Sequence, residues 1–296
     1  MKRGLTLWRA SRFARIFSSP GEGQTPFQTE PSKSIGNIFV KIVIVADRAQ
    51  MGSWAAEHAA SELRRVIADR GHANLLIATG SSQFEVLDAL SRQPDVDWSS
   101  VTGFHLDEYI GVSPEHPASF CGYLMARFVD RVPLKKFHFL RGDGDTSQTM
   151  RVVGTELTTG SSIPPIDVAM VGIGENGHLA FNDPPADFEC DDPYIVVKLD
   201  EACRLQQVGE GWFPDLKSVP EYAISMSIRQ IMKSAMIICS VPDERKAVAV
   251  QRSVEGPVTP DVPASILQSH PNATLVLDRA ASSRLSSVAL QHAVML

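Results

Sequence analysis

The stretch Ile166–Pro185, IDVAMVGIGENGHLAFNDPP, joins a short apolar run to a loop of glycines and polar side chains. The apolar run, Ile166–Val171, has the length of a buried strand. The glycines that follow allow the backbone to turn sharply and to approach a ligand closely. His178 and Asp183 add an imidazole, which can move protons near neutral pH, and a carboxylate that can orient it. The stretch predicts a buried strand that leads into a catalytic loop, with a strand and a simple glycine turn as the structural alternative.

The composition is that of a globular α/β protein. The 296 residues are 44% apolar and 21% charged, which is enough for a sizeable core in one large domain or two small ones. A net charge of −6 gives no general electrostatic reason to bind nucleic acid or an anionic membrane. No apolar run approaches the roughly 18 residues that a membrane helix needs, so we expect a soluble protein.

The cysteines and histidines do not form the pairs that disulfide frameworks or metal sites need. The cysteines are widely spaced, without a C-x-x-C pair, which favours free thiols in a reducing cytosol and predicts a cytoplasmic protein. No two histidines have the spacing of metal ligands on a helix, so we predict no metal site. The four cysteines are Cys121, Cys190, Cys203 and Cys239.

Residues 1–37 differ in composition from the rest of the chain. Five basic side chains and no acid precede Glu22, and a stretch rich in Ser, Pro, Gly and Gln follows. Arg-rich, acid-poor segments can be organelle transit peptides, but the apolar residues here do not form the continuous core of a secretory signal. The interpretation that we favour is a disordered extension, or a start codon placed too far upstream. We expect residues 38–296 to form a single domain.

Beyond this segment, short apolar strands alternate with amphipathic helices. The alternation predicts a mostly parallel sheet that is covered by helices on both faces. Residues 184–220, rich in Pro, Asp and Gly, are expected to form a long excursion over the sheet, the type of element that forms lids. The expected strands are Phe39–Val45, Leu75–Ala78, Val101–Leu106, Lys136–Leu140, Ile166–Val171, Ala223–Ile228, Ala235–Ser240 and Ala273–Leu277.

The run Thr79-Gly80-Ser81-Ser82 stands between an expected strand and an expected helix. A helix start offers free backbone N–H groups and the positive end of the helix dipole, and Gly80 allows an anion to approach them. Thr79, Ser81 and Ser82 add hydroxyl donors. The motif therefore predicts an anion site, with N-capping by serine as the structural alternative. It is shorter than a P-loop and lacks the G-K-[ST] ending, so we do not expect a nucleoside triphosphate.

Two adjacent acids, Asp107 and Glu108, follow the expected strand Val101–Leu106. In open parallel sheets, ligands bind at this edge. Because neighbouring side chains on an extended segment point in opposite directions, one acid can face the cleft while the other braces the structure. A further candidate, Lys246, lies in the first turn of the expected helix Ala247–Val254, where the helix dipole disfavours a cation. A bound anion would explain this position, and a solvated lysine is the alternative.

Three motifs, TGSS, LDEYIG and GIGENGHLAFNDPP, occur in this order along the chain. Together they resemble the glucosamine-6-phosphate deaminase (isomerase) family, and the similarity continues through Lys246 and SVEGPVTPDVPASILQSHP, over residues 40–278. The related 6-phosphogluconolactonases share the fold and a G-x-x-x-G-H loop but lack the AFN-x-P continuation. The resemblance implies an α/β fold, a Rossmann-like three-layer sandwich with a mostly parallel sheet, that assembles into homo-oligomers. It also implies conversion of an amino-sugar phosphate to fructose 6-phosphate and ammonia, without a redox cofactor or a catalytic metal.

The resemblance further implies a role for each matching residue. Asp107 would take the C2 proton of the substrate and return it to C1, as in aldose–ketose isomerisation. His178 would open the pyranose ring, and Asp183 would orient and polarise His178. The expected catalytic residues are Asp107, Asn176, His178 and Asp183, and those expected to bind the substrate and its phosphate are Thr79, Gly80, Ser81, Ser82, Glu108, Gly174, Gly177, Arg204 and Lys246.

Two positions depart from the usual pattern of the family. Asn176 stands where a second catalytic aspartate is common, and an amide can hydrogen-bond a substrate but cannot exchange a proton. Asp183 replaces the usual glutamate of AFN-E-P and is shorter. These changes leave open whether the substrate is glucosamine 6-phosphate or galactosamine 6-phosphate. The remaining alternatives are a 6-phosphogluconolactonase-type hydrolase and a sugar-phosphate-binding regulator without catalysis.

Overall fold

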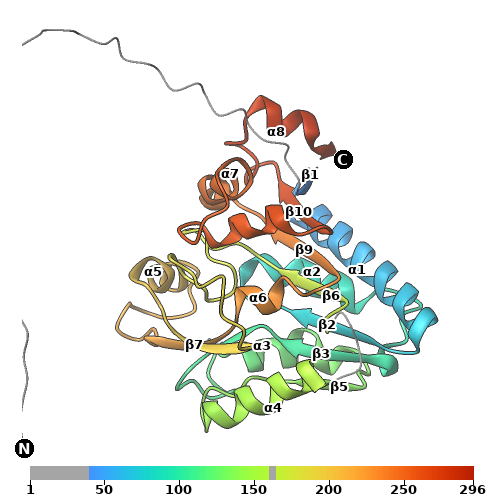
Figure 1. Cartoon of the computed structure of the whole chain (residues 1–296), viewed down its shortest axis with the longest axis vertical. Helices are drawn as coiled ribbons and strands as arrows, with labels where there is room; N and C mark the ends of the chain where they lie inside the picture. The colour runs from blue at the N-terminus through green and yellow to red at the C-terminus, as the bar shows by residue number, and fades with distance from the viewer. Residues whose placement is uncertain (1–39, 160–164) are drawn as a thin grey trace, which may run out of the picture. The chain divides into compact units, whose positions relative to one another are not determined.

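The computed structural model describes residues 40–159 and 165–296, so the expectation for residues 1–37 lies outside the described part of the chain. Within that part the strands form two sheets, one of eight strands and one of three. Figure 1 shows the strands of the larger sheet following one another from β1 near the top of the view to β5 near the bottom. Among the helices of the same residues, none combines the length and the apolar character that crossing a membrane requires.

Every strand pairing in the larger sheet is parallel, in the order β11-β1-β10-β9-β6-β2-β3-β5. Most of these strands are runs of Val, Ile, Leu and Ala, as expected for a sheet that is buried on both faces. The mostly parallel sheet predicted from the alternation of strands and helices is confirmed. The strands are β1 (Lys41–Val45), β2 (Ala73–Ile77), β3 (Val101–His105), β5 (Lys136–His138), β6 (Val168–Val171), β9 (Met236–Val241), β10 (Ala273–Asp278) and β11 (Val294–Met295).

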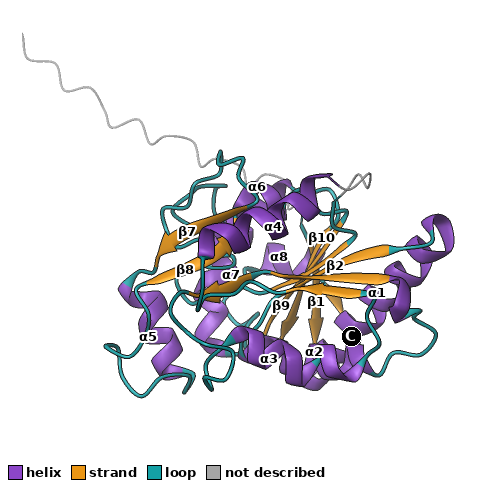
Figure 2. Cartoon of the chain, turned by 90° about the horizontal axis from the view of Figure 1, so that it is seen from below, coloured by secondary structure: helices purple, strands orange, loops and turns teal. Residues whose placement is uncertain are grey.

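Successive residues of each central strand point into two different hydrophobic cores, one on each face of the larger sheet. Leu75 and Ile77 of β2 belong to a core with α1, α2 and α3, whereas Leu76 between them belongs to a core with α4, α6 and α7. Figure 2 shows helices on both faces of the sheet, which confirms the three-layer α/β fold. The α-helices are α1 (Arg48–Arg70), α2 (Phe84–Ser91), α3 (Phe120–Arg127), α4 (Thr146–Thr159), α5 (Glu201–Gly209), α6 (Ile228–Ile231), α7 (Ala247–Glu255) and α8 (Ser287–His292), and the short 3-10 helices are η1 (Ser81–Gln83), η2 (Trp98–Ser100), η3 (Val129–Arg131), η4 (Glu244–Lys246) and η5 (Pro263–Ser269).

The long helix α1 is bounded by Asp47 and Gly71. The side chain of Asp47 accepts a hydrogen bond from the backbone N–H of Gln50 at 2.9 Å, which caps the first turn. Gly71 ends the helix in the left-handed conformation, with φ 78°, and donates its N–H to the carbonyl oxygen of Ile67. Because α1 ends at Gly71, β2 starts directly after it and carries the chain to the Thr79–Ser82 loop.

The smaller sheet is antiparallel, and it corrects one prediction and refines another. Of the predicted strand Ala223–Ile228, residues 223–226 belong to this second sheet rather than to the parallel one, and Ile228 begins the helix α6. Residues 184–220, predicted as an excursion over the sheet, contain the strand β7 and the helix α5. In β7 the more buried side chains alternate with exposed ones, which is typical of a sheet with one covered face. The strands, in spatial order, are β4 (Asp107–Tyr109), β8 (Tyr222–Met226) and β7 (Tyr194–Lys198).

Candidate active site

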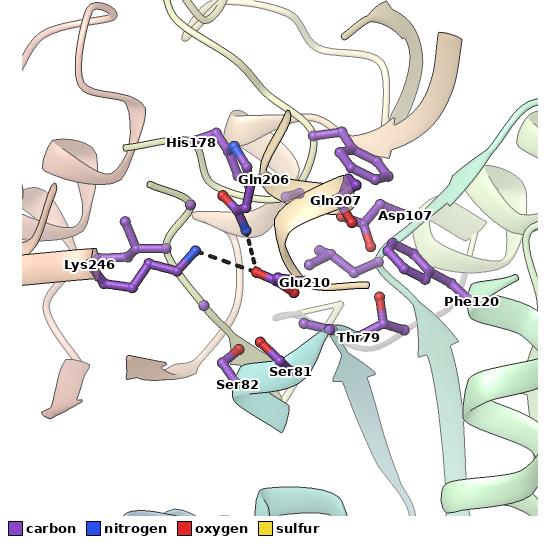
Figure 3. Close-up of a pocket in the computed structure, with 18 of the residues that line it drawn as sticks. Thr79, Ser81, Ser82, Asp107, Phe120, His178, Gln206, Gln207, Glu210 and Lys246 are labelled. Atoms are coloured by element: carbon purple, nitrogen blue, oxygen red, sulfur yellow. Dashed lines mark hydrogen bonds and ion pairs between the residues drawn. The ribbon is translucent and has the colours of Figure 1, made fainter. Parts of the chain in front are cut away.

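A pocket lies where four neighbouring strands of the larger sheet end. The strands β9, β6, β2 and β3 are adjacent in that order, and the segment after each of them lines the pocket. Helix α5 and the loop that carries His178 supply further parts of the wall (Figure 3). Ligands of parallel sheets bind at this edge because segments from several strands meet there. The segments that follow the strands contribute Ala78–Ser82, Leu106 and Asp107, Gly172–Gly174, and Pro242 and Asp243 with Lys246.

Asp107 is the buried acid of this pocket. The residue is 6% exposed, and its Oδ1 has no hydrogen-bond partner among the described residues. Burial raises the pKa of Asp107 from 3.8 to about 8, and the neighbouring carboxylate of Glu108 adds to the rise. A carboxyl group with a pKa near neutrality and a free oxygen is suited to accept and return a proton.

Glu108 does not line the pocket, and its carboxylate binds the start of α3 instead. It accepts hydrogen bonds from the backbone N–H groups of Phe120 at 3.1 Å and Cys121 at 2.7 Å, and from the Ser119 hydroxyl at 3.0 Å. A carboxylate suits this position because the first N–H groups of a helix have no partner within the helix. One acid therefore faces the pocket while its neighbour braces a helix. The expectation that Glu108 binds substrate does not agree with this geometry.

Replacing Glu108 with alanine should lower the free energy of unfolding by about 3 kcal/mol, because several buried donors lose their acceptor. Urea denaturation measures the difference. The matched control is Glu115→Ala, which removes an exposed carboxylate from the loop between β4 and α3. It should change the free energy of unfolding by no more than about 0.5 kcal/mol. A Glu108→Ala protein that is fully stable but binds substrate weakly would instead place Glu108 in the site.

His178 stands on the loop after β6 and lines the pocket. Its Nδ1 lies 3.2 Å from Oδ1 of Asp183, whose other oxygen accepts a hydrogen bond from the backbone N–H of Asp200 at 2.9 Å. Burial alone raises the pKa of Asp183, but the contact with His178 and the bonds from Asn176 and Asp200 lower it overall. Asp183 is therefore an anion held against Nδ1 of the imidazole, at contact distance but without the geometry of a hydrogen bond.

Two glycines shape the loop around His178. A Cβ on Gly174 would lie 2.2 to 2.3 Å from atoms of the His178 ring, so the imidazole can take its position only beside a glycine. Gly177 has a positive φ of 89° and donates its N–H to the carbonyl oxygen of Gly174 at 3.0 Å, which closes the turn. Gly174 lines the pocket, as expected for a substrate-binding residue, whereas Gly177 serves the turn.

Asn176 lies behind the histidine and does not line the pocket. Its Nδ2 donates to Oδ1 of Asp183 at 2.9 Å and to Oδ2 of Asp200 at 3.0 Å, and its Oδ1 accepts from the backbone N–H of His178 at 3.0 Å. An amide fits this position because it can bridge two carboxylates that would otherwise repel each other. The structure thus places Asn176 as a support of the His178–Asp183 pair rather than as a group in contact with a ligand.

The Asn176→Asp variant should be less stable and less active than the wild type at neutral pH. An aspartate would put a third carboxylate beside Asp183 and Asp200 and would remove both bridging hydrogen bonds, which should cost about 2 kcal/mol of unfolding free energy. The loss should shrink as the pH falls and the added carboxyl group takes up a proton that it can donate. Urea denaturation at two pH values checks the stability. A faster enzyme would contradict the supporting role and would show that an acid–base group had been restored.

The loop after β2 and Lys246 form one polar end of the pocket. Among the described residues that line the pocket, Lys246 is the only lysine or arginine. Gly80 has φ 92°, which turns the backbone into the short helix η1. Arg48 donates a hydrogen bond to the carbonyl oxygen of Ser81 and so holds this turn from outside. Lys246 is 5% exposed, and burial lowers the pKa of its ammonium group. Thr79, Gly80, Ser81, Ser82 and Lys246 are therefore brought together as the sequence predicts.

The sequence and the fold match one family of proteins. The family described as glucosamine-6-phosphate isomerases/6-phosphogluconolactonase matches residues 46–276. The chain belongs to this family. A glucosamine-6-phosphate deaminase of Exiguobacterium sp. is 40% identical over 208 residues, which cover 70% of this chain and 79% of that protein. A glucosamine-6-phosphate deaminase of Lactobacillus delbrueckii subsp. bulgaricus is 35% identical over 246 residues, which cover 83% of this chain and 100% of that protein.

Solved structures of the family have the same fold. The structure of a monomeric glucosamine-6-phosphate deaminase has a TM-score of 0.73 at 28% identity and covers 82% of this chain and 99% of its own. A 6-phosphogluconolactonase from Trypanosoma brucei has a TM-score of 0.68 at 14% identity and covers 84% of this chain and 100% of its own, a likeness that concerns the fold alone. The resemblance to the deaminase family that the three motifs indicate is confirmed.

In this member of the family, α5 and the residue that follows it add side chains that the predicted site lacks. Gln206, Gln207 and Glu210 line the pocket. Gln207 accepts a hydrogen bond from the Tyr109 hydroxyl at 2.6 Å, and Gln206 donates one to Glu210 at 2.7 Å. The signal in the sequence is weak: a pair of glutamines followed by Val-Gly-Glu-Gly, in a stretch whose composition suggests a loop.

Arg204, expected to assist in substrate binding, has a structural role. It does not line the pocket, and its Nη2 donates to the carbonyl oxygens of Leu216 at 2.7 Å and Val219 at 2.9 Å. A guanidinium is suited to this because its donors can satisfy two carbonyl groups at once. Arg204 thus ties α5 to the segment before β8, and the expectation of a substrate contact does not agree with its position.

Two buried clusters among the described residues could in principle hold a metal ion. His178, Asp183 and Cys203 form one, and His105, Glu108 and Cys121 form the other, with potential ligand atoms within 4.8 Å of one another in each. Burial raises the pKa of both thiols, which disfavours the thiolate that a metal would need. In the second cluster the carboxylate is also occupied by the start of α3. These groups fit a metal poorly, and the absence of a metal site stays a prediction.

Proposed function

We propose that this enzyme converts an amino-sugar phosphate, glucosamine 6-phosphate, and water to fructose 6-phosphate and ammonia by aldose–ketose isomerisation and hydrolytic deamination. The observation that carries the proposal is the content of one pocket: a buried carboxyl group, an imidazole paired with a carboxylate, and a donor-rich loop beside a lysine. Relatives at 35% and 40% identity are glucosamine-6-phosphate deaminases, which supports the same activity here.

Asp107 is the group that we assign to proton transfer between carbons. A proton next to a carbonyl or an imine is removed by a positioned carboxylate whose pKa lies near the working pH. Asp107 has such a pKa, and its unpartnered Oδ1 is free to take the C2 proton and to return it to C1. The electrons stay within the sugar during this step, so the route needs no redox cofactor.

His178 is the group that we assign to ring opening. An imidazole can accept the proton of one sugar oxygen and give a proton to another near neutral pH. Asp183, at 3.2 Å from Nδ1, keeps the ring in the orientation that this exchange needs. Asn176 in turn holds Asp183, so its part in the reaction is support of this pair.

The Thr79–Ser82 loop and Lys246 are the groups that we assign to the phosphate. The loop offers hydroxyl groups and backbone N–H groups, and Lys246 offers the positive charge. Because the phosphate is remote from the carbons that react, its binding energy can be used to hold C1 and C2 against Asp107.

Ammonia release from the purified protein tests the proposal, with glucosamine 6-phosphate and galactosamine 6-phosphate offered in parallel. Turnover of the first to fructose 6-phosphate supports it, and turnover of the second alone would name the other epimer. If neither sugar releases ammonia, the proposed deamination is rejected. Hydrolysis of 6-phosphogluconolactone would then favour a lactonase, and thermal stabilisation by the sugars without turnover would favour a regulator.

We also propose that residues 38–296 act as a single domain in the cytoplasm and that copies of the chain associate into a homo-oligomer. A hydrophobic core shared by strands of both sheets supports the single domain. Four free cysteines suit a reducing compartment. The strand β11 at the edge of the larger sheet exposes Val294 and Met295, which suits contact with a second copy. Light scattering measures the mass, and a monomer, as described for one relative, would reject the oligomer.

A further inference from the structure

The carboxylate of Glu210 lies in the part of the pocket that we assign to the phosphate (Figure 3). Its Oε1 is 3.9 Å from Nζ of Lys246 and accepts a hydrogen bond from Gln206 at 2.7 Å, and its Oε2 accepts one from the Trp212 indole at 3.2 Å. Figure 3 shows Glu210 between Lys246 on one side and Ser81 and Thr79 on the other. The side chain is 5% exposed, and the Lys246 side chain is 6% exposed.

Glu210 is held there as an anion. Burial alone raises the pKa of Glu210, but Lys246 and the hydrogen bonds from Gln206, Trp212 and Ser81 lower it overall. A carboxylate thus uses the lysine and a hydroxyl of the donor-rich loop, which are groups that a phosphate would use.

A phosphate group and the Glu210 carboxylate cannot both occupy this end of the pocket. Two anions that share one buried lysine repel each other strongly, because the surroundings screen the charges far less than water does. Lys246 is the only cation among the residues that line the pocket in the described part of the chain, so a second anion would have no cation of its own.

Glu210 lies outside the strands of both sheets, at the end of a helix. Glu210 follows the last residue of α5, with Gly209 before it and Gly211, at φ 81°, after it. Neither glycine has other atoms within 4 Å of the place where a Cβ would stand, so both are in open surroundings. The neighbouring positions thus carry no side chains beside Glu210, and rotation about its own side-chain bonds is enough to turn the carboxylate away from Lys246.

We infer that the carboxylate of Glu210 occupies the site of the substrate's phosphate when no substrate is bound. The substrate then binds by displacing this carboxylate from Lys246 and Ser81. The inference rests on the proposed function, because it takes the Thr79–Ser82 loop and Lys246 as the phosphate site. Glu210 then sets the affinity for the phosphate group: the free enzyme keeps its buried lysine paired, and each substrate molecule must compete with a carboxylate of the enzyme itself.

The Glu210→Gln variant tests this inference, because glutamine keeps the size and the acceptor oxygen of the side chain but removes its charge. The control is Glu201→Gln, which removes an exposed carboxylate from the same helix. Calorimetric titration with inorganic phosphate should show about tenfold tighter binding to Glu210→Gln than to the wild type or the control, a change of about 1.4 kcal/mol. The KM for glucosamine 6-phosphate should fall in parallel, whereas binding of glucosamine, which has no phosphate, should stay unchanged.

Phosphate binding to Glu210→Gln that is unchanged or weaker, while the wild type releases ammonia from the sugar phosphate, would overturn the inference alone and make Glu210 a ligand of the substrate. Failure of the proposed function has a different pattern: no ammonia from the wild type, and no phosphate binding to any of the three proteins. That pattern overturns both. Thermal unfolding confirms that Glu210→Gln is folded, and Glu210→Ala provides a second variant without the charge.

Discussion

The Asp107→Asn variant should remain folded and lose at least about 100-fold in kcat/KM for the amino-sugar phosphate, because an amide cannot take the C2 proton. Asp107 is the buried acid that lines the pocket with an unpartnered oxygen, and asparagine has nearly the same shape. The loss should therefore appear in turnover, with substrate affinity little changed. Steady-state kinetics of the two proteins measures it, and an Asp107→Asn enzyme with wild-type turnover would remove Asp107 from the mechanism.

The raised pKa of Asp107 gives this prediction a pH dependence. The base must be ionised, so wild-type kcat/KM should rise with pH up to about pH 8, where burial places the pKa of Asp107. Stability should change in the opposite direction. The unfolded chain loses this proton near pH 3.8, and the folded protein keeps it up to about pH 8, so the contribution of Asp107 to stability is complete below about pH 4 and is lost as the pH rises to 8.

Asparagine at position 107 cannot ionise, so the stability of Asp107→Asn relative to the wild type should increase between pH 5 and pH 8. Urea denaturation of both proteins at the two pH values measures the difference. A difference that does not change with pH would mean that burial does not raise the pKa of Asp107.

The Gly174→Ala variant should lose about 100-fold in kcat, the scale of a catalytic group displaced by about 1 Å. The added methyl group would lie 2.2 Å from Cε1 of His178 and 2.3 Å from Nδ1 and Nε2, so the ring must move. Its contact with Asp183, at 3.2 Å, would be lost with that movement. Kinetics with glucosamine 6-phosphate measures the loss.

The matched control is Gly144→Ala, because a Cβ at this exposed glycine meets nothing within 4 Å. It should keep wild-type kinetics and stability. Wild-type turnover in a folded Gly174→Ala enzyme would contradict the position of His178 beside the glycine, or its part in the reaction.

The main sheet could be predicted from the sequence because most of its strands are short apolar runs and several of them lead into a helix. In β2 and β6, burial on both faces leaves an apolar residue at almost every position, and the shortness of these runs favours strands over helices. The strand β8, YAISM, has the same appearance, and yet it pairs antiparallel with β4 and β7. The sequence of β8 gives no sign that the strand pairs antiparallel, because the pairing depends on where β4 leaves the larger sheet.

The structure brings predicted site residues together where their segments follow strands of the larger sheet. Asp107, His178 and Lys246 line one pocket because the ends of parallel strands meet at one edge. Which of the two acids at positions 107 and 108 faces the pocket could not be predicted, since it depends on the position of α3. Glu210 was also beyond prediction, because its place beside Lys246 is set by the packing of α5 across the strand ends rather than by any local pattern.

The most direct measurement of the proposed activity is the yield of ammonia and of fructose 6-phosphate from one sample of glucosamine 6-phosphate, for the wild type and for Asp107→Asn. We expect the wild type to form the two products in equal amounts and Asp107→Asn to form neither at a measurable rate. A folded wild-type protein that forms neither product, or an Asp107→Asn variant that forms both as fast as the wild type, would contradict the role of this pocket.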